Sequence, residues 1–356
     1  MRVAFDVGLP LQQPTGVTRY TVELGPRLRD LGVVLKPYRI ALRAPRTGDA
    51  MHWRLPARAV HLAWWLMDKP PIEALVGDVD LVHGTNFVLP ATRVAPGVVT
   101  IHDLSFVRPD GFAPDRRVAR MVEWSVRRAR AVICPSVSVS EEIAAAYGVS
   151  ESRLFVTPEG IGPEFRAPAP LNDLALANLG IRRPFAMALG TLQPRKNLHA
   201  LVAAWDAARD DLDGWQLALV GPPGWGSKLP PAPGVVCTGW IDHTLLPGLL
   251  AAAEVFCFPS LYEGFGLPPL EAMAAETPVL AGDYPVASEI LGDAALIVDR
   301  RSVESIAEGL RALALDGSLR EQLVARGRTR SASFTWEQTA ARTLDAYHSA
   351  MSASGR

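Results

Sequence analysis

Short apolar runs recur along the whole chain, and each is followed by glycine or polar residues and then by a segment with helical spacing. Apolar runs of about four to seven residues bounded by turn residues predict buried strands of a parallel sheet. Strands that alternate with helices predict an α/β protein built on parallel sheets. The runs that carry this prediction are 3–7, 80–84, 98–101, 131–136, 155–161, 185–190, 215–221, 235–241, 255–258, 279–281 and 295–298.

The proline-rich segment 162–173 interrupts this alternation and has the composition of a linker. A chain of 356 residues is also long enough for two domains that each bury a full core. We therefore predict a first domain over residues 1–165 and a second domain over residues 166–336.

The loop after the buried run 255–258 has the pattern of an anion site. Gly264 and Gly266 allow the backbone to turn sharply and to bring its N–H groups close to a ligand. Pro268 and Pro269 favour the first turn of a following helix, where a missing N–H is not needed. Unpaired amides and the helix dipole both attract an anion to such a terminus.

Two glutamates flank this loop, Glu263 directly before it and Glu271 inside the helix. Carboxylates beside an anion site suit hydroxyl groups, which donate hydrogen bonds, rather than the anion itself. A ligand that carries both phosphates and hydroxyls, such as a sugar nucleotide, fits both features. The plain alternative is a strand, a turn and an amphipathic helix with a solvated Glu271.

The sequence EGFGLPPLEAMA, which begins at Glu263, resembles the Glu-x7-Glu element of the retaining GT-B glycosyltransferases of family 4, the group-1 type. Residues 277–281 and 288–290 are similar to the continuation of that family, and the chain is most similar in character to bacterial mannosyltransferases of polysaccharide assembly. The resemblance implies two Rossmann-like parallel-sheet domains that face each other across a cleft. It also implies that the C-terminal helix, about residues 337–356, crosses back to the first domain.

Arg195 and Lys196 follow the predicted strand 185–190 and precede a predicted helix over 198–208. Two cations at the carboxyl edge of a strand suit a diphosphate, which an arginine can bind through two hydrogen bonds. They resemble the pyrophosphate-binding pair of the family; a solvated charge pair is the alternative. The resemblance implies that the donor is bound by Gly16, Gly190, Arg195, Lys196, Gly239, Ile241, Gly264, Phe265, Gly266, Leu267 and Glu271.

His102 and Asp103 directly follow the predicted strand 98–101, at the sheet edge where ligands of α/β proteins gather. They resemble the His-Asp dipeptide of family 4, whose histidine contacts the transferred sugar; a purely structural histidine is the alternative. The loop 15–20 resembles the first glycine-rich loop of the family, with Thr-Gly in place of two adjacent glycines, and a plain turn is its alternative. The expected acceptor contacts are Arg19, Tyr20, Asn86 and Asp103.

The resemblance implies transfer of a hexose from a nucleoside diphosphate to a hydroxyl of a saccharide or glycolipid acceptor, with retention of the anomeric configuration. Arg195 and Lys196 would neutralise the leaving diphosphate in place of a metal, and Glu271 would accept the ribose hydroxyls. Glu263 would hold hydroxyls of the sugar, and His102 would position that sugar and support its positive charge. The spacing reveals no nucleophile, so front-face displacement is the expected reaction.

The loop 15–20 and the sequence His102-Asp103-Leu104 are similar to mannosyltransferases, so we expect GDP-mannose as the donor. UDP-glucose or ADP-glucose is the alternative. Two other classes also stay open, a sugar-nucleotide 2-epimerase and a non-catalytic protein that binds a nucleotide sugar. The combination of Arg-Lys-Asn with Glu-x7-Glu argues against the first, and the intact site residues argue against the second.

Composition restricts the partners. A net charge of -1 gives no support to nucleic-acid binding, and 49% hydrophobic with 21% charged residues is typical of a globular protein. The N-terminus has a strand pattern rather than that of a signal peptide, and no apolar run approaches the ~18 residues of a membrane span, so we expect a cytoplasmic protein. Buried thiols are predicted for Cys134, Cys237 and Cys257. The Asp-x-Asp sequence 78–80 precedes a strand, at the wrong edge for a ligand, so we expect no metal and no cofactor.

Arginines at positions 116, 120 and 127 share one face of a predicted helix over 116–130. A solvated face is the default interpretation, and peripheral contact with an anionic membrane, at its inner face, is the alternative. The segment 39–70 is rich in arginine and tryptophan, for which packing is favoured over contact with sugar or lipid. A homo-oligomer is left open.

Overall fold

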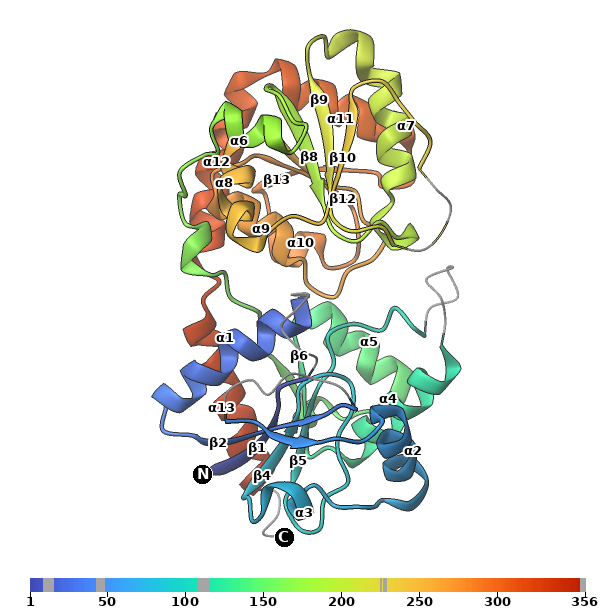
Figure 1. Ribbon diagram of the computed structural model, residues 1–356, viewed down its shortest axis with the longest axis vertical. Helices are drawn as coiled ribbons and strands as arrows, with labels where there is room; N and C mark the ends of the chain where they lie inside the picture. Colours follow the sequence, from blue (N-terminus) through green and yellow to red (C-terminus); the bar gives the residue numbers. More distant parts are fainter. Residues whose placement is uncertain (9–15, 43–48, 108–114, 225, 227–228, 353–356) are drawn as a thin grey trace. The chain divides into compact units, whose positions relative to one another are not determined.

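The computed structural model describes residues 1–8, 16–42, 49–107, 115–224, 226 and 229–352. The chain forms two compact units (Figure 1). The first comprises Met1–Gly160 and the chain from Thr335 onward, and the second comprises Ile161–Phe334. Both boundaries lie a few residues before the predicted ones at 165 and 336.

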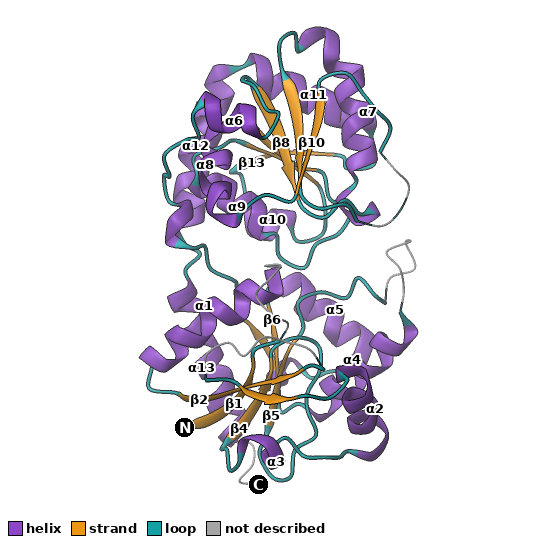
Figure 2. Cartoon of the chain, viewed as in Figure 1, coloured by secondary structure: helices purple, strands orange, loops and turns teal. Residues whose placement is uncertain are grey.

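The first unit is built on a seven-stranded sheet in which all neighbouring strands are parallel. The inner strands β4, β5 and β6 are buried along their whole length, because helices cover both faces of the sheet (Figure 2). In spatial order the strands are β3 (Met51–Trp53), β2 (Val34–Ile40), β1 (Arg2–Asp6), β4 (Leu81–Gly84), β5 (Gly97–Thr100), β6 (Ala131–Cys134) and β7 (Leu154–Val156).

Two separate cores form on the two faces of this sheet. One core joins the sheet to α1 (Gly16–Asp30) and α13 (Trp336–Ser352). The other core joins it to α2 (Ala57–Met67), α3 (Glu73–Val76), α4 (Arg116–Arg128) and α5 (Val137–Tyr147). A single 3-10 turn, Glu151–Arg153, precedes β7.

The second unit is built on a six-stranded parallel sheet with the order β10 (Val235–Gly239), β9 (Gln216–Val220), β8 (Phe185–Leu189), β11 (Val255–Phe258), β12 (Val279–Gly282) and β13 (Ala295–Val298). One face packs against α7 (Leu198–Ala208) and α11 (Val303–Leu315). The other packs against α6 (Asp173–Asn178), α8 (Leu246–Ala252), α9 (Leu267–Ala274) and α10 (Ala287–Leu291), and α12 (Gly317–Ala332) contacts both α9 and α11. Single 3-10 turns occupy Pro163–Phe165, Pro194–Lys196, Arg209–Asp211 and His243–Leu245. The predicted α/β class with two parallel sheets is confirmed.

Each sheet has one point at which the order of strands reverses. In the first sheet this switch point lies between β1 and β4, and in the second it lies between β8 and β11. Chain segments that leave two such strands turn to opposite faces of the sheet, and the space that opens at their carboxyl ends is where ligands of open α/β sheets bind. The fold therefore specifies one candidate site position in each unit.

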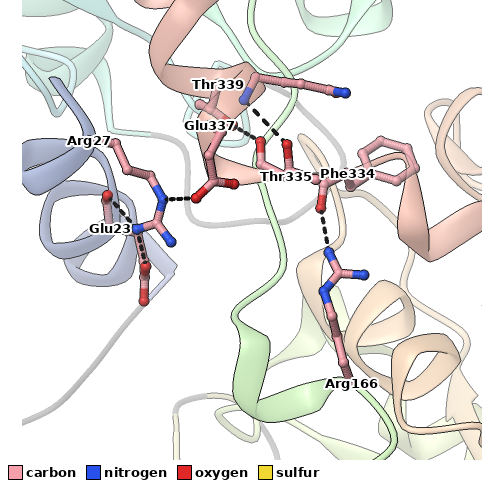
Figure 3. Close-up of polar contacts among 8 residues, drawn as sticks. Glu23, Arg27, Arg166, Phe334, Thr335, Glu337 and Thr339 are labelled. Carbon is pink, nitrogen blue, oxygen red and sulfur yellow. Dashed lines mark hydrogen bonds and ion pairs between the residues drawn. The ribbon is translucent and has the colours of Figure 1, made fainter. Parts of the chain in front are cut away.

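The last helix, α13, belongs to the first unit although the chain reaches it from the second. Trp336 and Tyr347 of α13 are buried against β-strands and α1. Near its first turn, Arg27 of α1 donates to Glu337 at 2.8 Å (Figure 3). On the other side of the chain crossing, Arg166 donates to the carbonyl of Phe334 at 3.5 Å within the second unit. These contacts fix both ends of the crossing segment.

Several details differ from the sequence predictions. Strands β2 and β3 were not predicted, and in β2 Lys36 and Pro37 interrupt the apolar pattern. Cys237 is exposed rather than buried, since β10 is an edge strand. The helix α4 ends at Arg128, so Arg130 lies beyond it. No helix in the described part of the chain is both long and apolar enough to cross a membrane.

Candidate active site

The carboxyl edge of the second sheet carries a cluster of one carboxylate and two cations. Arg195 and Lys196 lie in the 3-10 turn after β8, and Glu263 lies in the loop after β11. Lys196 Nζ donates to Glu263 Oε1 at 2.8 Å, and Arg195 Nη1 donates to Glu263 Oε2 at 2.5 Å. Arg195 Nη1 also donates to the carbonyl of Tyr262 at 2.9 Å. Because β8 and β11 flank the switch point, the fold itself brings these loops together.

The cluster is largely removed from water. The exposed fractions of the Arg195, Lys196 and Glu263 side chains are 18%, 12% and 9%. Burial alone would raise the pKa of Glu263, but the charges of Arg195 and Lys196 outweigh it and lower that pKa to about 2. The carboxylate is therefore ionised at neutral pH. Two cations and one carboxylate leave the cluster with a net single positive charge.

The turn that presents the two cations depends on special backbone positions. Gly190, directly after β8, has a φ of +136°, and a Cβ there would lie 3.2 Å from Lys196 Cε. Asn197 adopts the left-handed conformation at φ +57°. Its side-chain amide donates to the carbonyl of Pro259 at 3.1 Å and to that of Arg300 at 2.7 Å. Asn197 therefore ties the cation turn to the segments that follow β11 and β13.

The glycine loop 264–267 leads directly into α9. Gly266 precedes the helix with a φ of +104°, which only glycine adopts without strain. Pro268 and Pro269 occupy the first turn, as predicted. They carry no N–H, so the donors available to an anion at this terminus are the amides of the loop itself. Phe265 is 5% exposed and its ring lies in the core, so only its backbone can face a ligand.

Apart from Gly16 of the first unit, the other predicted donor residues lie on the same unit. Glu271 lies in α9 and is 3% exposed. Gly239 ends β10 with a φ of +71°, and Ile241 packs partly against the core. Because β10 lies two strands from β8, these two residues are at the carboxyl edge but beyond the cation cluster. The structure thus brings Glu263 into contact with Arg195 and Lys196, whereas Gly239 and Ile241 lie two strands away along the same edge of the sheet.

His102 follows β5 in the first unit and is 9% exposed. Its Nε2 lies 2.9 Å from the carbonyl oxygen of Thr85, and its Nδ1 lies 3.3 Å from Oε1 of Glu159. The ring of Tyr20 meets the imidazole edge to face, with 5.0 Å between centroids. Glu159 was not among the predicted site residues. It lies three residues after β7, at the same sheet edge, but inside the run 155–161 that the sequence predicts as a strand.

The predicted residues of the first loop and of α1 have different surroundings. Gly16 is the exposed first residue of α1, and Thr15 and the residues from 9 onward before it lie outside the described residues. Arg19 is half-buried on α1. Tyr20 is only 1% exposed. Its predicted contact with an acceptor is therefore corrected: the side chain packs in the core and against His102.

Two predicted acceptor residues lie after β4 and β5. The Oδ1 atom of Asn86 is buried and accepts no hydrogen bond from any described residue. Asp103 Oδ1 accepts from the amide of Ser105 at 2.9 Å and from its hydroxyl at 2.7 Å, which stabilises the turn after β5. Asn86 thus has an unpaired but buried acceptor, whereas one oxygen of Asp103 already serves the backbone.

The Asp-x-Asp sequence lies at the amino edge of the first sheet. Asp80 forms an ion pair with Arg2 of β1 at 2.8 Å, and the carbonyl of Asp78 accepts from Lys36 at 2.9 Å. Among the described residues, no group of three or more His, Cys, Asp or Glu side chains is arranged to hold a metal ion. The aspartates of this sequence therefore serve the first sheet, at the edge opposite to the one that carries His102.

Two family models match the chain. The model described as Glycosyltransferase Family 4 matches residues 14–165, and that described as Glycosyl transferases group 1 matches residues 177–330. The chain is a group-1 glycosyltransferase of family 4. This family membership makes it a hexosyltransferase, and its two parallel sheets form a GT-B fold.

Curated relatives of this glycosyltransferase include enzymes of O-antigen assembly. The O-antigen chain mannosyltransferase B of Escherichia coli is 31% identical over 295 residues, which cover 75% of this chain and 74% of the relative. The O-antigen chain mannosyltransferase RfbU of Salmonella typhimurium is 27% identical over 266 residues, with 70% of each chain covered.

Solved structures share its fold at lower identity. The sucrose-phosphate synthase of Thermosynechococcus elongatus matches with a TM-score of 0.77 and 22% identity, over 99% of both chains. The Anabaena protein HepE, solved with UDP and glucose, matches with a TM-score of 0.73 and 17% identity, over 97% of this chain and 98% of that one.

Removal of the charge on Glu263 tests the electrostatic account of the cluster. We expect Glu263→Gln to lower the free energy of unfolding of the second unit by about 3 kcal/mol at pH 7, because two buried cations lose their counter-charge. The pKa of Glu263 is lower in the folded protein than its ordinary value of 4.5. The difference between wild type and variant is therefore fully present above pH 4.5 and is lost as the pH falls toward about 2.

Urea denaturation at pH 7 and pH 3 measures this difference. Glu304→Gln is the matched control, because Glu304 is 70% exposed and lies 3.7 Å from Arg311 on the surface of the same unit. Equal effects of the two substitutions, or an effect of Glu263→Gln that does not shrink at pH 3, would contradict the account.

Proposed function

We propose that this glycosyltransferase moves mannose from GDP-mannose onto a hydroxyl of a saccharide or glycolipid acceptor, with retention of the anomeric configuration. The observation that carries the proposal is the cluster of Arg195, Lys196 and Glu263 at the switch point of the second sheet. Two cations in a largely dry position match a leaving group that gains negative charge, and they require no metal for that purpose.

The residues would divide the work by charge. Arg195 and Lys196 would hold the diphosphate together with the amides of the loop 264–267, and Glu271 would accept the ribose hydroxyls. Glu263 uses each of its oxygens on one cation, yet a carboxylate oxygen has further lone pairs, so a sugar hydroxyl can still donate to it. His102 would contact the transferred sugar.

The choice of donor rests on the relatives. Two of them are named O-antigen chain mannosyltransferases, which favours GDP-mannose over the alternative, UDP-glucose or ADP-glucose. The glucose alternative has support from HepE, which holds UDP and glucose on a similar fold. Peripheral contact of α4 with an anionic membrane is a further part of the proposal, and Arg116, Arg117 and Arg120 of α4 are exposed for such a contact.

A binding panel tests the donor. Addition of GDP or GDP-mannose is expected to raise the melting temperature more than UDP, ADP, dTDP or their sugars at equal concentration, because a ligand that binds only the native state stabilises it by mass action. A larger shift with UDP-glucose or ADP-glucose would replace mannose by glucose. Proton NMR of the product from the shifting donor then shows whether the new linkage keeps the donor's anomeric configuration; inversion would contradict the proposed mechanism.

Substitution of a cation tests the site. Arg195→Ala is expected to lower kcat/KM for donor turnover by about 100-fold or more, the usual loss when a group that stabilises transition-state charge is removed. Arg326→Ala is the matched control, because Arg326 is half exposed and lies on α12 of the same unit. Turnover by Arg195→Ala within a few-fold of wild type would refute the diphosphate assignment.

A further inference from the structure

The imidazole of His102 is held by protein atoms on every polar edge. The carbonyl oxygen of Thr85 can only accept, so the ring nitrogen 2.9 Å from it, Nε2, must carry a hydrogen. The other nitrogen, Nδ1, lies 3.3 Å from Oε1 of Glu159. The rings of Tyr20 and Phe87 meet the imidazole edge to face, at centroid distances of 5.0 and 6.0 Å. A half-turn of the ring would place carbon atoms against both oxygens, so a single orientation satisfies them.

Glu159 is itself placed by the last helix of the chain. The carbonyl of Pro158 accepts from the hydroxyl of Thr339 on α13 at 2.7 Å. On the other side, Gly160 packs so closely on α13 that a Cβ there would lie 2.2 Å from the backbone nitrogen of Trp336. Contacts with α13 therefore hold the residues on both sides of Glu159, Pro158 and Gly160. Glu159 as a whole is 6% exposed, and its carboxyl group is directed at His102.

A buried carboxylate is costly unless a partner compensates it, so its presence beside His102 calls for a role. A purely structural role at this position would not require a carboxyl group, because any hydrogen-bonding side chain could fill it. Glu159 instead faces the one imidazole nitrogen that the backbone leaves unsatisfied, at the carboxyl edge of the sheet, where open α/β sheets bind ligands. In such pairs the carboxylate fixes the orientation of the histidine ring.

We propose that Glu159 is a positioning residue of the transfer reaction: it fixes the orientation of the His102 imidazole through Nδ1, while the carbonyl of Thr85 holds Nε2. The inference rests on the proposed role of His102 toward the transferred sugar. It assigns a function to a residue outside the donor-binding set, and it makes α13 part of the catalytic design, since α13 fixes the segment 158–160.

A double-mutant cycle tests the proposal. Glu159→Ala is expected to lower kcat about 10- to 100-fold, with KM for the donor within about 3-fold of wild type, as for other residues that orient a functional histidine. Glu159→Gln keeps a group that can form a hydrogen bond with Nδ1 and is expected to recover part of the loss. In a His102→Ala background, Glu159→Ala is expected to change kcat less than about 2-fold, because its effect runs through the missing ring.

Glu73→Gln is the matched control. Glu73 is another buried carboxylate of the first unit, and its Oε1 accepts from the amides of Arg93, Val94 and Ala95 before β5, at the opposite edge of the sheet. It is expected to lower the melting temperature as Glu159→Gln does and to leave kcat unchanged. A loss of kcat with Glu159→Ala that persists in the His102→Ala background, or an equal loss with Glu73→Gln, would overturn the proposal.

Histidine-selective 15N NMR gives a readout that does not depend on turnover. Wild type is expected to show one set of resonances for the two ring nitrogens of His102, and Glu159→Ala is expected to broaden or split them, because the ring loses the partner of Nδ1; unchanged resonances would overturn the proposal. If His102→Ala keeps wild-type kcat while Arg195→Ala loses it, the proposal fails and the proposed transferase site stands. If neither substitution lowers turnover, the proposed function itself fails.

Discussion

The ion pairs that the buried carboxylate of Glu263 forms with Arg195 and Lys196 are the interactions on which the proposed donor site depends. Arg195 and Lys196 lie next to each other in a largely dry turn, where their charges repel. Glu263 holds both through separate oxygens and draws together two loops that leave the sheet on either side of its switch point. The three side chains together carry one net positive charge. The same pairing therefore stabilises the loops and leaves the site attractive to a polyanion.

Neighbouring segments hold the cluster of Arg195, Lys196 and Glu263 in place, and other segments hold the pair of His102 and Glu159 in the first unit. Asn197 anchors the cation turn to the segments after β11 and β13. In the first unit α13 plays the comparable part, because it fixes the segment around Glu159 and buries Tyr347, whose hydroxyl lies 2.7 Å from His83. Burial lowers the pKa of His83 to about 3, so this second histidine stays neutral and serves packing.

Much of the donor site follows from residue order alone. Gly264, Gly266 and the two prolines after them encode a turn and a helix start wherever they occur, and Arg195 and Lys196 follow a strand whose apolar run is unmistakable. The pairing of Glu263 with both cations joins residues 67 and 68 positions apart, so it depends on the strand order and not on any local pattern. Glu159 was missed for the same reason: its meaning comes from His102, 57 positions away.

Where local and tertiary preferences conflict, the sequence pattern misleads. Pro37 lies inside β2, which the parallel neighbours β1 and β3 stabilise in spite of the missing N–H. Tyr20 belongs to the segment 15–20, which resembles a ligand-binding loop, and so contact with an acceptor was expected. Its aromatic ring instead packs in the core of the first unit.

The central claim is that the donor diphosphate binds at the switch point of the second sheet, on Arg195, Lys196 and the loop 264–267. A crystal structure of the protein with GDP tests it most directly. The account predicts diphosphate oxygens within about 3.2 Å of the Arg195 guanidinium, the Lys196 ammonium and at least one loop amide, the range of hydrogen bonds. A diphosphate bound elsewhere on the chain, with the pairs to Glu263 undisturbed, would contradict it.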